Sequence, residues 1–302
     1  VAGTHGKTTT SSLIAHILKT ANIDCTAFLG GITQNYNTNL LLSENLKSGN
    51  KSATKKAIVV VEADEYDRSF LTLHPNVAVI TSVDADHLDI YGDAKEMEES
   101  YALFANQINA EGVLITKKNV QEKIGYSKST LTYSLDEQTD YAANKISIKN
   151  GFYVYDIKCP DEIIDNVTLG ILGKHNVENS IAAVAAVRQL KVSASDIKNA
   201  LQSFKGVKRR FEYIIKTEKL IFIDDYAHHP EELNALISGV RSLFDKKLTV
   251  VFQPHLFSRT KDFADEFAQA LDKADEVILL PIYPARELPM EGVTSELILN
   301  KM

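Results

Sequence analysis

The most restrictive feature of this sequence is the alternation of amphipathic helical patterns with short apolar runs rich in Val and Ile. Three such runs lie in the segments 57–64 (AIVVVEAD), 76–86 (NVAVITSVDAD) and 112–116 (GVLIT). Runs this short and this continuous are typical of strands buried on both faces of a parallel sheet. Helical patterns at 15–22 and 96–109 lie before and between them. The alternation predicts an α/β domain with a doubly wound parallel sheet.

The segment 130–172 has a different pattern, in which apolar and polar residues alternate. The alternation is clearest in KISIKNGFYVYDIK, whose centre is Asn150-Gly151. Asn-Gly is the favoured sequence of a two-residue hairpin turn. We therefore expect a small antiparallel sheet attached to the parallel one.

Two helices and a boundary follow. The Ala-rich stretch 175–190 predicts one helix, and 193–204 predicts a second with Ser193 or Ser195 as its N-cap. The segment GVKRR interrupts the pattern, so we expect a central domain at 1–207 and a C-terminal domain at 208–302.

The C-terminal domain repeats the strand and helix alternation. Apolar runs in KLIFIDDY, KLTVVFQP and EVILLPIY are separated by helical patterns at 230–243 and 262–271. The order predicts a Rossmann-like α/β unit. The run EVILLPIY is followed by no closing strand, so we expect this unit to be incomplete.

Composition narrows the class of protein. The chain has 302 residues, 44% hydrophobic and 24% charged, as in ordinary globular proteins. A net charge of -7 without a basic block argues against binding to nucleic acid. Only two cysteines are present and no apolar run reaches the length of a membrane span, so we expect a cytoplasmic protein without membrane insertion.

A phosphate-binding loop is indicated near the start of the chain by GTHGKTT, residues 3–9. Backbone N–H groups at a helix N-terminus can bind phosphate oxygens, while Lys7 reaches the terminal phosphates and Thr8 binds Mg²⁺. The general pattern has Gly where Val1 stands. The alternative is a Gly-rich loop that only caps the helix, which leaves Lys7 without a role.

Acidic residues follow two of the predicted strands. Glu62 and Asp64 end the first, and the second ends in VDADHLD, which contains His87. Carboxylates at the carboxyl edge of a parallel sheet can hold Mg²⁺ against phosphates, and ligands bind at that edge. The alternatives are an acidic turn for the first cluster and a structural histidine for the second.

The motifs as a set resemble those of the Mur ligase family. They are GTHGKTTT, EADEYDRSFL, DADHLDIYGD, LGKHNVENSIAA, GVKRRFE, DDYAHHPEE and FQPHLFSRT, in the family's order and spacing. The EADE, DADH, DYxHHP and FQPH-x-x-SRT elements are most similar to the branch that adds L-alanine. The second candidate is the related branch that adds an intact murein tripeptide.

The resemblance implies an ATP-dependent ligase that uses Mg²⁺ and takes the small molecules UDP-N-acetylmuramate and L-alanine as partners. It implies an acyl-phosphate intermediate on the muramyl carboxylate. It also implies that the family's N-terminal UDP-binding domain and the end of its C-terminal domain lie outside this sequence.

The resemblance also assigns roles to individual residues. The ATP-binding residues would be Gly3, Thr4, His5, Gly6, Lys7, Thr8, Thr9, Asn176, Asn179, Arg210 and Asp225. Of the Mg²⁺ ligands, Thr8 and Glu62 would hold one ion and His87 would serve a second, and the amino acid would meet His228, His255 and Arg259. The catalytic set would be Lys7, His87, Arg210 and His228. Leu256 stands where some members carry Arg, which leaves Arg259 as the one Arg of that motif.

A different class remains open from the residues alone. A P-loop switch or nucleotide-binding protein would also use Gly6, Lys7 and Thr8, with its second domain docking a partner. Release of ADP that requires both the sugar nucleotide and alanine would separate a ligase from such a protein.

Overall fold

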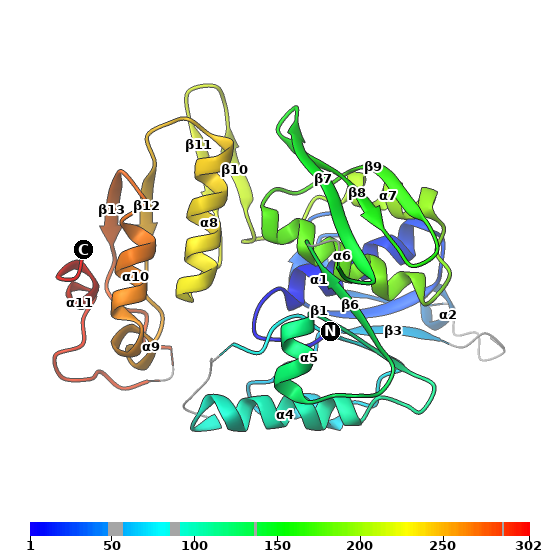
Figure 1. Ribbon diagram of the computed structural model, residues 1–302. Helices are drawn as coiled ribbons and strands as arrows, with labels where there is room; N and C mark the ends of the chain where they lie inside the picture. The colour runs from blue at the N-terminus through cyan, green and yellow to red at the C-terminus, as the bar shows by residue number, and fades with distance from the viewer. Residues whose placement is uncertain (48–56, 85–90, 136–137, 286) are drawn as a thin grey trace. The chain divides into compact units, whose positions relative to one another are not determined.

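The computed structural model describes residues 1–47, 57–84, 91–135, 138–285 and 287–302 (Figure 1). Their contacts divide the chain into two compact units, Val1–Lys208 and Arg209–Met302. The predicted α/β fold class is confirmed, with parallel strands and small antiparallel sheets. Within the described ranges, none of the helices combines the length and apolar character needed to cross a bilayer.

The larger sheet of the first unit has the strand order β4-β5-β6-β7-β8-β9. Its strands are Val77–Ile80, Val113–Thr116, Thr130–Ser134, Tyr141–Lys149, Phe152–Lys158 and Ile163–Thr168. Neighbours from β4 to β7 are parallel, and β7, β8 and β9 are antiparallel. Asn150 and Gly151 join β7 to β8 with φ of 51° and 78°, the two positive values that a type I′ hairpin turn requires.

A second sheet has the order β2-β1-β3, with strands Thr38–Leu41, Cys25–Thr33 and Ile58–Val61. Strands β1 and β2 were not predicted, because Gly30 and Gly31 interrupt the apolar pattern of β1. The start of the chain lies between β3 and β4. The N–H of Ala2 donates to the carbonyl of Val79 at 2.8 Å, and the amine of Val1 donates to that of Val61 at 2.8 Å. The carboxyl ends of β3 and β4 therefore lie on either side of the segment that enters the Gly-rich loop.

Helices cover both faces of the parallel strands. The helices are α1 (Lys7–Thr20), α2 (Glu44–Lys47), α4 (Ala94–Asn106), α5 (Lys118–Ile124), α6 (Lys174–Arg188), α7 (Ala194–Ser203) and the 3-10 helix Ser69–Thr72. Val79 and Ile115 pack in one core with Ile181 of α6, whereas Ile80 packs in another with Phe104 of α4. Successive residues of a strand point to opposite faces, so the sheet is buried on both, as predicted.

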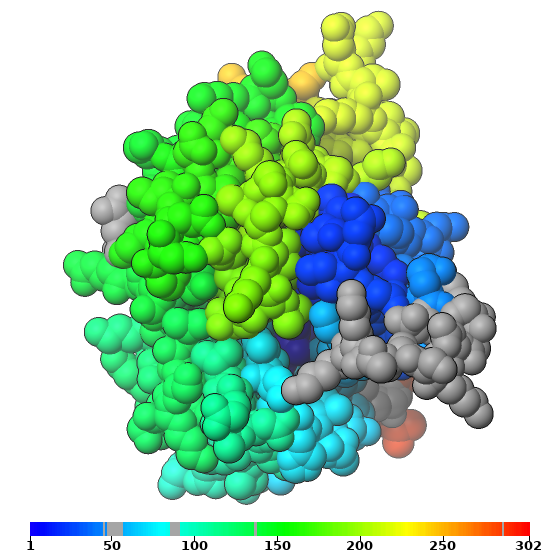
Figure 2. Space-filling model, turned by 90° about the vertical axis from the view of Figure 1, so that its right-hand side faces the viewer, coloured from blue at the N-terminus to red at the C-terminus, as the bar shows by residue number. Residues whose placement is uncertain are grey.

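The helices α1, α6 and α7 form one layer. α1 contacts both α6 and α7. Figure 2 shows the blue surface of α1 beside the yellow-green surface of α7. The N-cap of α7 is Ser193, whose side chain accepts the N–H of Asp196 at 3.1 Å. Of the two candidates, Ser193 is therefore the cap.

The second unit contains two strand pairs, β10-β11 antiparallel and β12-β13 parallel. Its elements are β10 (Glu212–Lys216), β11 (Ile221–Asp224), α8 (Pro230–Leu243), β12 (Thr249–Phe252), α9 (Phe257–Asp262), α10 (Ala264–Leu271), β13 (Glu276–Leu279) and α11 (Glu296–Leu299). Leu233 and Ile237 of α8 pack on Phe267 and Leu271 of α10 to make its core. The helix predicted at 262–271 begins at Ala264, because Phe263 separates it from α9.

His16 is a buried polar residue at the junction of α1 with α7. Its Nδ1 lies 2.8 Å from the Tyr36 hydroxyl and its Nε2 lies 3.0 Å from Ser203 Oγ. Burial lowers the pKa of His16 from 6.5 to about 4. The folded protein therefore holds this imidazole neutral at a pH where the unfolded chain would protonate it.

We expect His16 to make the protein acid-sensitive. Because the folded pKa lies below the unfolded one, its contribution is complete above pH 6.5 and is lost as the pH falls toward 4. The lost free energy of unfolding is on the order of 3 kcal/mol. Urea unfolding at several pH values should show a smaller acid loss for His16→Gln than for the wild type. His74→Gln is the control, because His74 is exposed. Equal pH profiles for the wild type and both variants would contradict the assignment.

Candidate active site

The loop between Ala2 and α1 has glycine at two positions where φ is positive and a side chain would clash. Gly3 has φ of 124°, and a Cβ there would lie 2.8 Å from the backbone nitrogen of Ser82. Gly6 is the N-cap of α1 with φ of 83°, and a Cβ there would lie 2.6 Å from Asn179 Oδ1. The N-terminus of α1 is thus capped by a residue without a side chain, which leaves its N–H groups able to receive an anion.

Side chains from the end of β4 hold this loop. Thr4 Oγ1 lies 2.8 Å from Ser82 Oγ, which also accepts the N–H of His5 at 3.0 Å. The N–H of Asp84 donates to Thr4 Oγ1 at 3.1 Å. His5 Nε2 lies 3.9 Å from Asp84 Oδ2, and Thr9 is buried in the first turn of α1. The loop is therefore fixed before any ligand binds, which lowers the entropy cost of binding one.

Lys7 extends back over the loop. Its Nζ donates to the carbonyl of Gly3 at 2.7 Å and to Glu65 Oε1 at 2.6 Å. Glu65 is 1% exposed, and burial raises the pKa of its carboxyl group, an effect that the Lys7 charge opposes. The hydroxyl of Tyr91 donates to the backbone carbonyl of Glu65 at 2.5 Å. Glu65 was not predicted as a site residue, although it holds the one cation of the loop.

Thr8 and Glu62 form an oxygen pair at the start of α1. The Thr8 hydroxyl donates to Glu62 Oε1 at 2.7 Å, and Glu62 Oε2 accepts the N–H of Gly30 at 2.6 Å. A hydroxyl and a carboxylate are the ligand types that Mg²⁺ prefers, with waters and phosphates completing its shell. No group of three or more His, Cys, Asp or Glu with metal-binding geometry occurs in the described part of the chain. His87, predicted for a second Mg²⁺, lies outside that part.

Two asparagines of α6 lie next to the loop. Asn176 is 5% exposed, and its Nδ2 donates to the carbonyl of Leu172 at 2.5 Å. Asn179 Nδ2 donates to Asn176 Oδ1 at 3.1 Å, while Asn179 Oδ1 faces Gly6. Asn176 therefore fixes Asn179, and of the two amides that of Asn179 is the nearer to the loop.

In the second unit, Asp225 shapes the turn that follows β11. Its Oδ2 accepts the N–H of Phe211 at 2.7 Å and its Oδ1 accepts the N–H of Ala227 at 2.8 Å. Burial raises the pKa of this carboxyl group. The predicted nucleotide contact would thus come from a residue that also holds the backbone on both sides of it.

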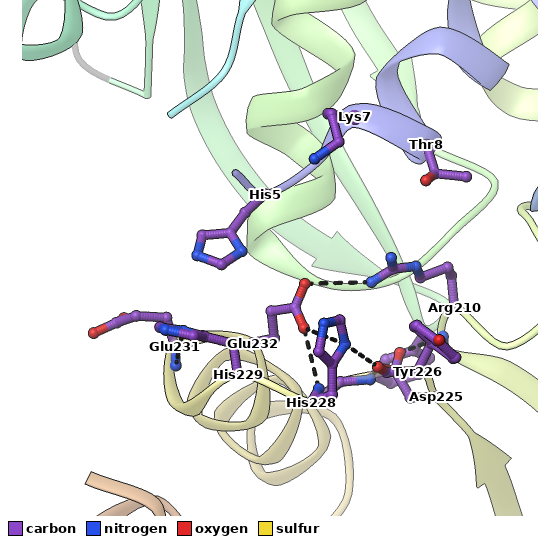
Figure 3. Close-up of polar contacts among 12 residues, drawn as sticks. His5, Lys7, Thr8, Arg210, Asp225, Tyr226, His228, His229, Glu231 and Glu232 are labelled. Carbon is purple, nitrogen blue, oxygen red and sulfur yellow. Dashed lines mark hydrogen bonds and ion pairs between the residues drawn. The ribbon is translucent and has the colours of Figure 1, made fainter. Parts of the chain in front are cut away.

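Arg210 and His228 meet on one carboxylate, that of Glu232 (Figure 3). Arg210 Nη1 lies 3.5 Å from Glu232 Oε1, and His228 Nδ1 lies 3.3 Å from Glu232 Oε2. The guanidinium carbon of Arg210 also lies 5.6 Å from the ring centre of Tyr226. Glu232 was not predicted as a site residue, and it joins two that were.

The predicted amino-acid residues continue from this cluster. The ring of His228 lies 5.9 Å from that of His255, which stacks on Tyr283 at 5.6 Å. Arg259 is 6% exposed, and its Nη1 lies 3.4 Å from His255 Nδ1. A guanidinium can only donate, so Nδ1 of His255 accepts and its ring proton lies on Nε2. The structure thus brings His228, His255 and Arg259 together on one side of the second unit.

The sequence only weakly indicates that Glu65 and Glu232, which were not predicted, belong to the site. Glu65 stands in EADE and Glu232 in HPEE, where neighbouring acids look the same. Glu65 is the acid after β3 that pairs with Lys7, and nothing in the sequence separates it from the other two acids of EADE. For Glu232, its spacing four residues after His228 on a helix start was the available indication.

Comparison with known proteins identifies the family. Residues 1–187 match the Mur ligase middle domain, and residues 209–302 match the Mur ligase, glutamate ligase domain. The chain belongs to the Mur ligase family. It is 48% identical to the UDP-N-acetylmuramate--L-alanine ligase of Flavobacterium johnsoniae, with 100% of this chain and 64% of the relative covered. The chain therefore spans slightly less than two thirds of the length of that relative.

Solved structures agree with this assignment. The UDP-N-acetylmuramate-alanine ligase of Thermotoga maritima matches with a TM-score of 0.76 and 27% identity, over 94% of this chain and 61% of that one. A murein peptide ligase of Psychrobacter arcticus matches with a TM-score of 0.66 and 25% identity, over 100% of this chain and 65% of that one. Both similarities run through the two units described above.

Proposed function

We propose that this chain is the ATP-binding and amino-acid-binding part of a cytoplasmic ligase that joins UDP-N-acetylmuramate to L-alanine. It would act as two domains, 1–207 and 208–302. The observation that carries the ATP-dependent chemistry is the arrangement of Lys7, Thr8 and Glu62 at the N-terminus of α1. The choice of L-alanine rests on the 48% identity to an L-alanine ligase along the whole chain.

The first step would activate the muramyl carboxylate. A carboxylate is a poor electrophile, so it takes the γ-phosphate of ATP and becomes an acyl phosphate, with ADP released. Lys7 and the N–H groups of α1 would stabilise the negative charge on the transferring phosphate oxygens. Lys7 must then exchange part of its contact with Glu65 for the phosphates. Thr8 and Glu62 would hold one Mg²⁺ and His87 would serve a second, and these ions would supply further neutralisation of phosphate charge.

The second step would form the amide. The amino group of alanine attacks the acyl carbon, and the tetrahedral intermediate expels phosphate. The attacking nitrogen must lose a proton, and His228, among the residues assigned to the amino acid, would accept it, because a neutral imidazole can take up a proton near neutral pH. Arg259 would hold the alanine carboxylate, because a guanidinium can bind both carboxylate oxygens at once. Arg210 and Asp225 would serve the nucleotide from the second domain.

Adenine recognition would depend on α6, and mainly on Asn179. We expect Asn179→Ala to weaken Mg-ATP binding by about 1 to 3 kcal/mol, because an amide matches the paired donor and acceptor of adenine. Calorimetry measures the affinity directly. Glu178→Ala is the matched control, since Glu178 precedes it on the same helix and pairs instead with Lys117 at 3.4 Å. Equal ATP affinity in Asn179→Ala and the wild type would show that Asn179 does not recognise adenine.

The test of the proposed function is ADP release by the ligase at the length of its relatives. We expect release that requires both UDP-N-acetylmuramate and L-alanine, and a product whose mass is the sum of the two less one water. Release that requires the murein tripeptide would favour the related branch. ADP release that requires neither UDP-N-acetylmuramate nor L-alanine would indicate a nucleotide switch.

A further inference from the structure

Glu232 contacts two predicted site residues, Arg210 and His228, and lies at the start of a helix. Glu232 stands at the third residue of α8, whose N-cap is His229 and whose first residue is Pro230. A proline at this position and a capping side chain fix where a helix begins. The start of the helix therefore sets the backbone position of Glu232, and the contacts of its carboxylate hold the side chain.

The ring of His228 is held in one tautomer. Its Nδ1 lies 2.9 Å from the carbonyl oxygen of Tyr226, and a carbonyl can only accept, so Nδ1 carries a proton. The same Nδ1 lies 3.3 Å from Glu232 Oε2, which also accepts the backbone N–H of His228 at 3.1 Å. Nε2 is then the nitrogen that can gain or lose a proton.

The other oxygen of Glu232 holds Arg210. Arg210 Nη1 lies 3.5 Å from Oε1, and the side chain of Arg210 is about one third exposed while that of Glu232 is 14% exposed. A partly buried carboxylate with two cationic or donor partners is bound more firmly than an exposed surface pair. Removal of the Glu232 charge would release both partners at once.

We propose that Glu232 is a positioning residue that couples the nucleotide side of the second domain, through Arg210, to the amino-acid side, through His228. It fixes the direction of the Arg210 guanidinium and, together with the Tyr226 carbonyl, holds the Nδ1–H of His228, so that Nε2 is presented to the attacking amine. Glu232 itself contacts neither substrate. The roles of Arg210 and His228 toward substrates rest on the proposed function.

The first experiment uses the 302-residue chain and needs no turnover. In ¹⁵N NMR of the imidazole rings, His228 should show the Nδ1–H form in the wild type, with its signals assigned by their loss in His228→Gln. Glu232→Gln should shift the His228 Nδ1 signal, because this N–H then loses its carboxylate acceptor and keeps only the Tyr226 carbonyl. Glu231→Gln is the control, because it makes the same charge change on the exposed neighbouring residue of α8. Unchanged His228 signals in Glu232→Gln would overturn the positioning role.

The second experiment uses the ligase at the length of its relatives. We expect Glu232→Gln to raise KM for both ATP and L-alanine by about tenfold, and Glu231→Gln to change neither. In an Arg210→Ala background, Glu232→Gln should lose its effect on ATP, and in a His228→Gln background its effect on L-alanine. Effects that simply add in both backgrounds would overturn the coupling, since they would mean that Glu232 acts only on general stability.

Two outcomes are kept distinct by this design. If the wild type shows no alanine-dependent ADP release, the proposed function fails, while the NMR result still decides whether Glu232 positions His228. If Glu232→Gln does not fold, Glu232→Asp replaces it, because the shorter side chain keeps the charge but reaches both partners less well. Wild-type KM values in a folded Glu232→Asp, together with wild-type His228 signals, would contradict the positioning of Arg210 and His228 by Glu232.

Discussion

Replacing Lys7 with Met should lower alanine-dependent ADP release by about a hundredfold to a thousandfold, the range seen when one preorganised charge or donor is removed from a transition state. Met keeps most of the length of the side chain and removes the ammonium group. Lys7 is the only lysine or arginine among residues 3–9, so no other permanently charged cation of this segment can replace it. Steady-state kinetics with saturating ATP separates this loss from weaker binding.

The same change should also affect stability, because Glu65 would lose its partner. Glu65 is 1% exposed, and a buried charge without its counter-ion costs about 3 to 5 kcal/mol unless it becomes protonated. The raised pKa of Glu65 makes protonation the easier route. The double variant Lys7→Met/Glu65→Gln should therefore regain stability in urea unfolding without regaining activity. Activity that returned in the double variant would show that Lys7 is not needed for phosphoryl transfer.

The phosphate loop could be predicted from the sequence because its requirements are local. Gly3 and Gly6 need positive φ, and Lys7 and Thr8 follow at the start of the helix, so four neighbouring residues carry the information. Glu62 was predicted for a related reason, since it ends an apolar strand. Its pairing with Thr8, 54 residues away, depends on the segment at 1–2 lying between two strands, which no local pattern shows.

Glu65 and Glu232 show where prediction from sequence ends. Both lie in acidic clusters whose members look alike, and what selects one member is the set of side chains packed around it. Glu65 is chosen by burial next to Lys7, and Glu232 by a helix start that directs it between Arg210 and His228. Which acid of such a cluster is buried, and where it points, is decided by tertiary contacts, so periodicity and composition do not single it out.

The helices follow the same rule. The bounds of α8 were predicted from Pro230 to Leu243 and are confirmed, because proline at the first position and the preceding cap are local features. The next predicted helix was displaced by two residues at its start. Phe263 has φ of -119° there, and its ring packs against His229 with centres 5.0 Å apart. A tertiary contact thus interrupts a pattern that would otherwise continue.

The second large effect is expected at Arg259, the residue assigned to the alanine carboxylate. We expect Arg259→Lys to raise KM for L-alanine by about a hundredfold, since a lysine keeps the charge but cannot bind two carboxylate oxygens in a plane. Leu256 is 4% exposed and supplies no charge at a position where some members carry Arg. Arg259 is therefore the more important of the two positions. KM for ATP should stay near the wild-type value. Initial rates at varied alanine and fixed ATP give the comparison.

L-alaninamide distinguishes loss of carboxylate recognition from general damage. It has the amine and methyl group of alanine but no carboxylate, so the wild type should use it about a hundredfold less well, as expected when a charged hydrogen bond is left unmade. Arg259→Lys should lose most of this preference, because its remaining binding no longer depends on the carboxylate. Lys261→Gln, an exposed change on the same helix, should keep it. A preference that survives in Arg259→Lys would place the carboxylate on another group, and His255, 3.4 Å from Arg259, would be the next residue to test.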